Sequence, residues 1–423
     1  SLLLPLVAIA AVNLLKLKPK LIETASMPSK DGSAILKRLS RNVAVEALLG
    51  LGILLIVGHM GITPPARHVQ PDWPFASRWD WTVLENAPKA RAEVQRGFVW
   101  AGIGGIVLIT ALARRRRRAL TALIGLGALA YAGRVITDAV STDAYPTTYK
   151  RPAVVYQAIS VANGRSLYDD SGCASCHGAG GYGDGPLADE LRPKPADLTA
   201  PHANTHTAGD LFWWLSHGVK STSMPSFSQS LSEEDRWDLI NFMRAQSSGD
   251  RSRALAPVIE NEPWLVAPDF SYVTNSGEAK TLRDHRGGKI VLLVLLDVES
   301  TEQRLKELAD VLPALQSAQV EIIVVPNIVD LLNLTDRLPG LVASEGVREI
   351  SETYKLFARS FADESLVTGP RHVEFLIDKQ GYIRARWLPA ENDAWRKTDA
   401  LLKQVELLGN EKPRAPAPDE HVH

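Results

Sequence analysis

The chain of 423 residues has only two cysteines, Cys173 and Cys176, only four methionines and no excess of either charge. One cysteine pair excludes a disulfide framework. A formal net charge of −1 gives no global positive field, so we expect no nucleic-acid partner. The long apolar runs lie almost entirely in residues 1–140, and the remainder has the composition of soluble protein. We therefore expect a membrane part followed by one or two soluble domains.

Four apolar segments are candidate membrane spans: residues 1–15, 43–62, 97–113 and 119–140. The second has the length of about 20 residues that a helix needs to cross the hydrocarbon core. The first is short, and the sequence opens on Ser1 inside this apolar run, so we expect a truncated first span.

Basic residues fill the connections on one side of these spans. Seven lysines and arginines lie between the first two segments, and the run "RRRRR" at 114–118 lies between the last two. The positive-inside bias then places both connections in the cytoplasm. Residues 63–96 and everything after about 140 fall outside, which predicts a multi-pass protein of the bacterial inner membrane with periplasmic soluble domains. Nucleic-acid binding by the arginine run is the weaker alternative, because spans flank it closely.

The segment "RNVAVEALLGLGILLIVGHMGITPPARH" at 41–68 resembles the closing helices of the copper-resistance D (CopD) family of membrane proteins. The resemblance covers about residues 1–140 and implies a copper-related transport role, with further helices upstream. His59, Met60 and His68 are candidate copper ligands, because imidazole and thioether groups suit copper. Interfacial side chains at a helix end are the favoured interpretation of the same residues.

The sequence Cys173-Ala174-Ser175-Cys176-His177 has the C-x-x-C-H spacing of covalent c-type haem attachment. Two thiols add across the haem vinyl groups, and the histidine that follows becomes the proximal iron ligand. A thioredoxin-type dithiol normally opens a helix after a core strand, a context absent here. A zinc site needs two further ligands, and no other cysteine exists.

Met224, in "STSMPSF", is the predicted sixth ligand of the haem iron, with His202, His206 and His217 as rivals. Ligation by His177 and Met224 gives a higher potential than two histidines, which suits a haem that accepts electrons from the quinol side of a respiratory chain. With both axial positions filled, such a haem transfers electrons and binds no substrate.

Residues around this motif resemble class I cytochromes c over about 155–248. "AISVANGRSLYDDSGCASCHG" is similar to their N-terminal helix, with Gly164 and Tyr168 spaced for a close helix crossing. "LSEEDRWDLINFMRAQ" is similar to their C-terminal helix, and Ser232 with Asp235 forms a capping-box pattern at its start. We therefore expect an all-α class I cytochrome c domain over residues 151–250, with one covalent haem c.

Residues 266–300 resemble the start of redoxins, nearest to the copper-chaperone SCO type. Strands are expected at 290–296 and 320–327 and a hairpin at 372–387, which gives an α/β thioredoxin-like domain over 251–410. The segment "DVESTEQR" after the first strand lacks the cysteine pair, so thiol–disulfide exchange and a cysteine-based Cu(I) site are excluded there. His372 is expected to be structural. The Pro-rich tail, 411–423, is expected to be disordered.

The predicted fold class is thus multidomain: an α-helical membrane bundle over 1–150, an all-α cytochrome c and an α/β thioredoxin-like domain. The leading function is a membrane-anchored monohaem cytochrome that transfers electrons on the periplasmic side, within a respiratory or copper-linked complex. Copper transport or homeostasis with a redox haem is one alternative. A structural docking subunit is the other, and either role makes an enzyme the less favoured class. Expected partners are membrane lipid and redox proteins or other subunits.

Overall fold

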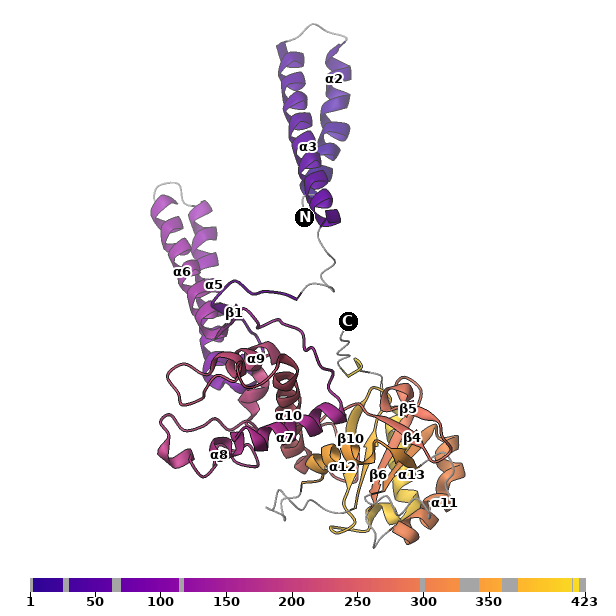
Figure 1. Cartoon of the computed structure of the whole chain (residues 1–423). Helices are drawn as coiled ribbons and strands as arrows, with labels where there is room; N and C mark the ends of the chain where they lie inside the picture. The colour runs from indigo at the N-terminus through magenta and orange to yellow at the C-terminus, as the bar shows by residue number, and fades with distance from the viewer. Residues whose placement is uncertain are drawn as a thin grey trace. The chain divides into compact units, whose positions relative to one another are not determined.

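The computed structural model describes most of the chain (Figure 1). The described residues are 3–25, 30–62, 70–113, 118–296, 301–326, 342–359, 372–412 and 414–417. They divide into two compact units, Ser1–Gln70 and Pro71–His423.

The first unit is helical. α1 (Leu3–Val12), a π-helical turn (Asn13–Leu17) and α2 (Lys18–Ala25) lie beside the long helix α3 (Lys30–Ile62). Asn13 Nδ2 donates to Glu46 Oε1 (3.0 Å), and Asn42 Nδ2 donates to Asn13 Oδ1 (2.7 Å). These two amides and the carboxylate thus hydrogen-bond to one another between helices that are otherwise largely apolar.

Three helices among the described residues are long and apolar enough to cross a membrane, compared with the four spans expected. They are Ser33–Gly58, Pro88–Ala111 and Arg118–Val140. The first expected segment, residues 1–15, is helical, but α1 has only 10 residues before the π-helical turn. This apolar segment is too short to count as a span, because basic residues follow it at Lys16, Lys18 and Lys20.

The second unit contains a helical hairpin, α5 (Pro88–Ala113) and α6 (Arg118–Val140), as the apolar pattern predicted. Glycines allow the two backbones to approach closely. A Cβ added at Gly104 would lie 3.0 Å from Gly125 O, and one added at Gly125 would lie 3.0 Å from Gly104 O. Trp100 and Tyr131 make an edge-to-face contact across the same pair, with centroids 5.5 Å apart. Small residues at the crossing are typical of helix packing in membranes.

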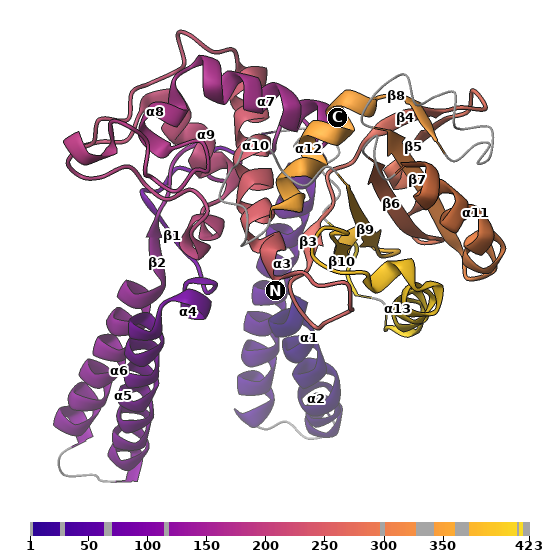
Figure 2. The ribbon, with the colours of Figure 1, turned by 90° about the horizontal axis from the view of Figure 1, so that it is seen from below.

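Two short strands connect this hairpin to the next domain. β1 (Ser77–Trp79) pairs antiparallel with β2 (Ser141–Asp143), which begins directly after α6. A one-turn helix, α4 (Val83–Asn86), lies between β1 and α5. Figure 2 shows the hairpin leading into β1 and β2 and from there into the helices that follow.

Residues 158–254 form an all-α domain, as expected. Its helices are α7 (Ala158–Asp170), α8 (Cys173–His177), α9 (Ala208–His217) and α10 (Glu233–Arg251), with 3₁₀ turns at Ala188–Glu190, Pro201–Thr205 and Ser252–Ala254. Helices α7 and α10 cross at Gly164, where an added Cβ would collide with the backbone oxygen of Asp238. The predicted capping box of Ser232 and Asp235 begins α10, with both hydrogen bonds formed. Burial of the apolar face of α10, including Trp237 and Ile240, completes this core.

The C-terminal domain is a twisted sheet of order β3-β10-β9-β6-β7 with helices packed on it. Its elements are β3 (Leu265–Val266), β6 (Ile290–Leu296), α11 (Thr301–Ser317), β7 (Val320–Pro326), α12 (Val347–Lys355), β9 (Val373–Ile377), β10 (Tyr382–Trp387) and α13 (Thr398–Asn410). β6 is parallel to β7 and antiparallel to β9, and every residue of β6 and β7 is buried. A parallel β-α-β unit followed by an antiparallel hairpin is the thioredoxin-like topology that the sequence predicted. A second small sheet has the order β5 (Ala279–Thr281), β4 (Ser271–Thr274), β8 (Ala343–Glu345).

The α-helical and α/β domains share one apolar core rather than a flexible linker. Buried side chains of α7 and α10, such as Val161 and Ile240, belong to the same cluster as Phe270 and Leu293. Ala158 N donates to Asp269 O (2.7 Å), and Thr353 Oγ1 donates to Ala158 O (2.9 Å). The two domains therefore pack against each other within one compact unit, Pro71–His423.

Part of the expected disordered tail packs on the sheet. Glu411 accepts from Arg384, with Nη1 2.5 Å from Oε2, and Ala417 N donates to Gln380 O (2.9 Å). Arg414 lies over the Trp264 ring, 4.0 Å from its centroid. The prediction of disorder from the proline-rich composition did not anticipate these contacts, because they depend on a buried arginine and an aromatic ring elsewhere in the chain. Residues 413 and 418–423 lie outside the described residues.

Candidate functional site

The two cysteines and His177 lie on the short helix α8, which follows α7 after a sharp turn. Gly172, before it, has φ +75°, and Gly178, after it, has φ +77°. This left-handed region is open to glycine and unfavourable for most other residues. At Gly178 a Cβ would in addition collide with the carboxylate of Asp184. The glycines therefore allow α8 to be short and closely surrounded by the loop that follows it.

Tyr168 holds the end of α8 to the crossing of α7 and α10. Its hydroxyl donates to Gly178 O (2.7 Å), and its ring packs against Phe242 with centroids 5.2 Å apart. Burial, reinforced by the nearby Cys173, raises the pKa of Tyr168. The hydroxyl therefore stays protonated and remains a donor.

His177 presents one ring nitrogen for ligation. Its Nδ1 lies 2.9 Å from Ala196 O. Since a carbonyl oxygen only accepts, Nδ1 is the donor of this hydrogen bond, and Nε2 is the ring nitrogen left for ligation. A backbone carbonyl that fixes the tautomer in this way is the usual support of a metal-binding histidine. No sequence pattern could predict this partner, because every residue carries a backbone oxygen.

The thiols of Cys173 and Cys176 form no disulfide. Burial raises the pKa of the Cys173 thiol to about 11. A redox dithiol needs the opposite, a pKa lowered toward neutrality that makes the thiolate available. The raised pKa of Cys173 is therefore the opposite of what a reactive redox dithiol has.

Met224 lies on a loop folded back against the end of α9. Its backbone nitrogen donates to Thr222 Oγ1 (3.1 Å), and its backbone oxygen accepts from Val219 N (3.3 Å). Its side chain is partly buried and packs against the domain's apolar core, as does that of Cys173.

Two of the rival histidines make other contacts. His217 Nδ1 lies 3.1 Å from Trp213 O, and the imidazole stacks on the Trp213 ring with centroids 3.7 Å apart. His206 packs edge-on against Trp214 (4.7 Å). The side chain of His202 lies outside the described residues. Two free thiols, an imidazole nitrogen and a thioether are the donor set that a covalently bound haem requires, so the residues present fit this group.

The copper candidates lie at the limit of what the structure describes. His59 and Met60 are on α3, but their side chains are outside the described part, and so is His68 altogether. Among the described residues, no three or more histidine, cysteine, aspartate or glutamate side chains cluster as a metal site. Copper binding by these residues stays a prediction.

In the α/β domain, His372 is part of a buried ionic cluster. His372 Nε2 lies 3.0 Å from Glu374 Oε1, and Arg304 donates to both oxygens of that carboxylate (2.7 and 2.8 Å). Burial opposes ionisation of Glu374, but Arg304 and His372 hold its pKa below the ordinary value. These contacts support the expectation that His372 is structural.

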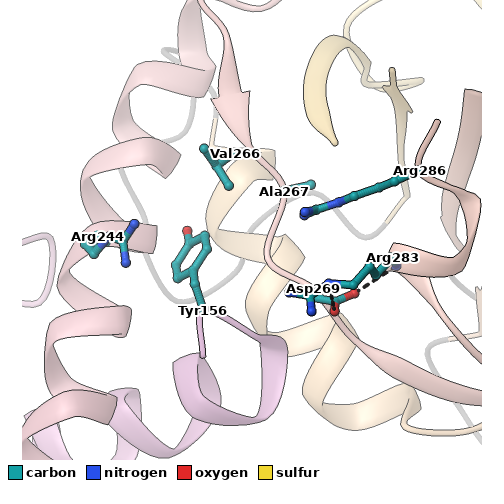
Figure 3. A pocket seen from close by; sticks show the side chains of 7 residues that line it. All are labelled: Tyr156, Arg244, Val266, Ala267, Asp269, Arg283 and Arg286. Atoms are coloured by element: carbon teal, nitrogen blue, oxygen red, sulfur yellow. Dashed lines mark hydrogen bonds and ion pairs between the residues drawn. The ribbon is translucent and has the colours of Figure 1, made fainter. Parts of the chain in front are cut away.

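A small cavity lies where the two soluble domains meet (Figure 3). It encloses about 10 Å³, the space of a single water molecule. It is lined by Tyr156, Arg244, Val266, Ala267, Asp269, Arg283 and Arg286. Asp269 Oδ1 accepts from the backbone nitrogens of Phe270 and Arg283 (3.0 and 3.1 Å), both in its own domain. The Asp269 backbone joins the two domains, because its oxygen accepts from Ala158 N (2.7 Å) and its nitrogen donates to Tyr156 O (3.1 Å).

Comparison with known proteins identifies the middle domain. Residues 161–247 match the family model for cytochrome c. This part of the chain is a cytochrome c domain. Proteins of this family bind haem c covalently, and their chemistry is electron transfer. The domain includes α8 and Met224, so all four predicted haem residues lie within the matched residues.

Comparison with curated proteins gave no match. Among solved structures, the Kuenenia stuttgartiensis reducing HAO-like protein complex Kustc0457/Kustc0458 is similar at 22% identity and a TM-score of 0.22, over 32% of this chain. This chain covers 62% of that one, less than two thirds of its length. A putative thiol:disulfide interchange protein DsbE from Chlorobium tepidum is similar at 18% identity (TM-score 0.26), over 36% of this chain and 99% of that one. BsSco, a member of the Sco family of cytochrome c oxidase assembly proteins, is similar at 14% identity (TM-score 0.28), over 37% and 99%. Likenesses this distant carry no functional argument.

Proposed function

We propose that this protein is a membrane-anchored monohaem c-type cytochrome that transfers electrons on the periplasmic side of the bacterial inner membrane. Cys173 and Cys176 attach the haem, and His177 and Met224 are its axial ligands. The observation that carries the proposal is the geometry of α8, where two free thiols accompany an imidazole whose Nδ1 is held by Ala196 O. Apolar helices α3, α5 and α6 support the anchoring.

Attachment needs no oxidant. The Cys173 and Cys176 thiols would each add across a vinyl double bond of a bound haem, with sulfur bonding to one carbon and hydrogen going to the other. A haem held in this way would provide a one-electron Fe(III)/Fe(II) couple. The protein holds Nε2 of His177 in the orientation that ligation needs, and a neutral thioether from Met224 stabilises the reduced state.

The α/β domain has a different role in this proposal. Without cysteines it has no thiol chemistry, and its buried side chains share an apolar cluster with those of the cytochrome domain. We assign it to docking with a redox protein or another subunit of a membrane complex. A docking role of this domain is the second function that we propose, that of a structural subunit of a membrane complex. The copper link rests on His59, Met60, His68 and the CopD resemblance alone.

The test is attachment itself. Cys176→Ala leaves one thioether, so the pyridine haemochrome band of the purified protein should shift toward that of a haem with one intact vinyl group. Ser175→Ala, between the two cysteines, is the matched control and should leave the band unchanged. A band in Cys176→Ala identical to that of the unaltered protein would sink the attachment proposal.

A further inference from the structure

Three large aromatic side chains are exposed near the outer end of the α5–α6 hairpin. Phe75, Trp79 and Trp81 have 63%, 67% and 50% of their surface exposed. We call these three residues the aromatic face. Trp73 borders it, with its ring in edge-to-face contact with Phe75 (centroids 5.3 Å apart). Side chains of this size are rarely left in water together on one surface without a partner.

The local backbone explains why these rings point outward. Along β1 and the residues after it, exposed and buried positions alternate: Trp79 and Trp81 are exposed, whereas Arg78 and Asp80 are 7% and 8% exposed. Successive side chains of an extended strand point to opposite faces. The ion pair of Arg78 with Asp80 (2.8 Å) occupies the inner face, so the Trp79 ring occupies the outer one. Phe75 and Trp81, in the bend before β1 and the turn after it, are exposed as well.

The aromatic face lies level with the end of a candidate span. Trp79 pairs with Ser141, the residue directly after α6, and Asp80 N donates to Val140 O (2.8 Å). Counted from Arg118, about 20 residues at roughly 1.5 Å each cross a hydrocarbon core of about 30 Å, which ends near residue 138. Ser141 and its partner Trp79 therefore fall about 5 Å beyond the core, in the headgroup layer.

Charged pairs on both helices lie just below this level, at the edge of the hydrocarbon core. Arg134 and Asp138 form an exposed ion pair on α6 (3.4 Å), and Glu93 pairs with Arg96 on α5. The two pairs lie at a similar height along the hairpin, because Gly97 faces Ile136 where the helices pack. Ion pairs at this position are suited to the edge of the hydrocarbon, where long side chains reach toward water.

We propose that the aromatic face is inserted in the phospholipid headgroup layer. This inference rests on the membrane attachment included in the proposed function. Tryptophan is enriched at this depth because its ring is apolar while its Nε1–H can donate to headgroup or water oxygens. The continuity of β1 with the end of α6 favours lipid over a protein subunit as the occupant.

The consequence concerns the cytochrome domain. Arg78, on the inner side of the same strand, pairs with Asp210 in the first turn of α9 (3.3 Å) and donates to Thr205 O (3.2 Å). The strand that carries Trp79 on one side thus binds the haem-bearing domain on the other. Insertion of the aromatic face holds that domain against the membrane surface, which suits exchange of electrons with a membrane-embedded partner.

The experiment places a photoreactive benzophenone amino acid at position 79 of the full chain in phosphatidylcholine nanodiscs. Matched variants carry it at Ile106, exposed in the middle of α5, and at Leu187, exposed in the cytochrome domain. After irradiation, intact-mass spectrometry measures the phospholipid adduct. Position 79 should form adduct as Ile106 does, at least about tenfold above Leu187.

Adduct at Ile106 without adduct at position 79 would overturn the inference and leave membrane attachment intact. No adduct at either position would overturn both. Haem content is measured on the same samples, so a protein that lacks covalent haem but forms adduct at position 79 would refute the cytochrome function while supporting the lipid contact.

Discussion

Arg78 Nη2 lies 3.3 Å from Asp210 Oδ2, and both side chains are more than nine-tenths buried. The two residues are 132 positions apart, one on β1 beside the membrane hairpin and the other in the first turn of α9. Asp210 also accepts from Thr148 Oγ1 (2.5 Å) and from Thr207 N (3.0 Å). One carboxylate therefore caps a helix of the cytochrome domain and binds the strand next to the candidate spans.

Asp210→Asn should loosen this connection. The substitution removes the charge that faces buried Arg78 while keeping the size of the side chain, and Asp80 still compensates in part. We expect the unfolding free energy of the cytochrome domain to fall by about 2–3 kcal/mol. Chemical denaturation of the full chain in detergent, followed by haem absorbance, measures it.

The matched control for this experiment is Asp189→Asn. Asp189 pairs with Lys194 (2.7 Å), but their side chains are 88% and 62% exposed. Exposed pairs contribute little to stability, so this variant should unfold like the unaltered protein. Equal destabilisation by both substitutions would show that the buried ion pair with Arg78 contributes no more to the unfolding free energy than an exposed pair does.

Met224→His should keep the iron six-coordinate but change its potential. A second imidazole stabilises Fe(III) relative to a thioether, so we expect the midpoint potential to fall on the order of 0.2 V, within the roughly 0.8 V range that axial ligands set. The far-red charge-transfer band of methionine–iron ligation should disappear at the same time. Redox titration and absorption spectra of the oxidised protein measure both effects.

Met243→Leu is the control for the ligand experiment, because Met243 lies on α10 and is partly buried in the same domain. It should leave both the potential and the far-red band in place. If Met224→His behaves in the same way as Met243→Leu, the sixth ligand is a different residue.

Features that depend on local spacing could be predicted from the sequence. The capping box of Ser232 and the buried strand Ile290–Leu296 each occupy a short stretch, and the structure confirms the cap and the strand. The C-x-x-C-H motif is equally local, and its role in haem attachment stays a prediction. The Ala196 carbonyl behind His177 and the partner of Arg78 could not be predicted. The first is a backbone atom, and the second joins charges far apart in the chain.

The pattern around Asp210 did hold a usable signal. Thr207 and Asp210 have the spacing of a capping box, and the structure forms both of its hydrogen bonds. This spacing predicts the start of α9. It does not predict the ion pair with Arg78, because the capping box involves only Thr207 and Asp210. Tertiary contacts of this kind need the folded chain.

Gly164→Ala should disrupt the crossing of α7 and α10. An added Cβ would collide with the backbone oxygen of Asp238, which cannot rotate away as a side chain could. We expect a loss of about 3 kcal/mol in unfolding free energy, at the upper end of the usual cost of overpacking. Gly409→Ala on α13 is the contrasting variant, since no atom lies within 4 Å of its added Cβ. A Gly164→Ala protein as stable as Gly409→Ala would contradict the close crossing.

The last prediction concerns acid stability of the α/β domain. Burial opposes the charge of Glu374, yet Arg304 and His372 lower its pKa below the unfolded value of 4.5. A carboxyl group with a lowered folded-state pKa stabilises the fold above its unfolded pKa. That contribution is lost as pH falls through the lower, folded-state pKa. The thermal stability of the domain should therefore decrease on acidification below about pH 4.5.

Glu374→Gln isolates this contribution. It leaves Arg304 buried, with the partly exposed Glu307 as its remaining carboxylate (2.9 Å), so we expect a loss of about 3 kcal/mol at neutral pH. The difference in melting temperature between this variant and the unaltered protein should narrow as pH falls below 4.5, because protonated Glu374 resembles glutamine. Calorimetry from pH 3 to pH 7 measures the difference. A difference that stays constant over this range would mean that Glu374 stabilises the sheet by packing and hydrogen bonding rather than by its charge.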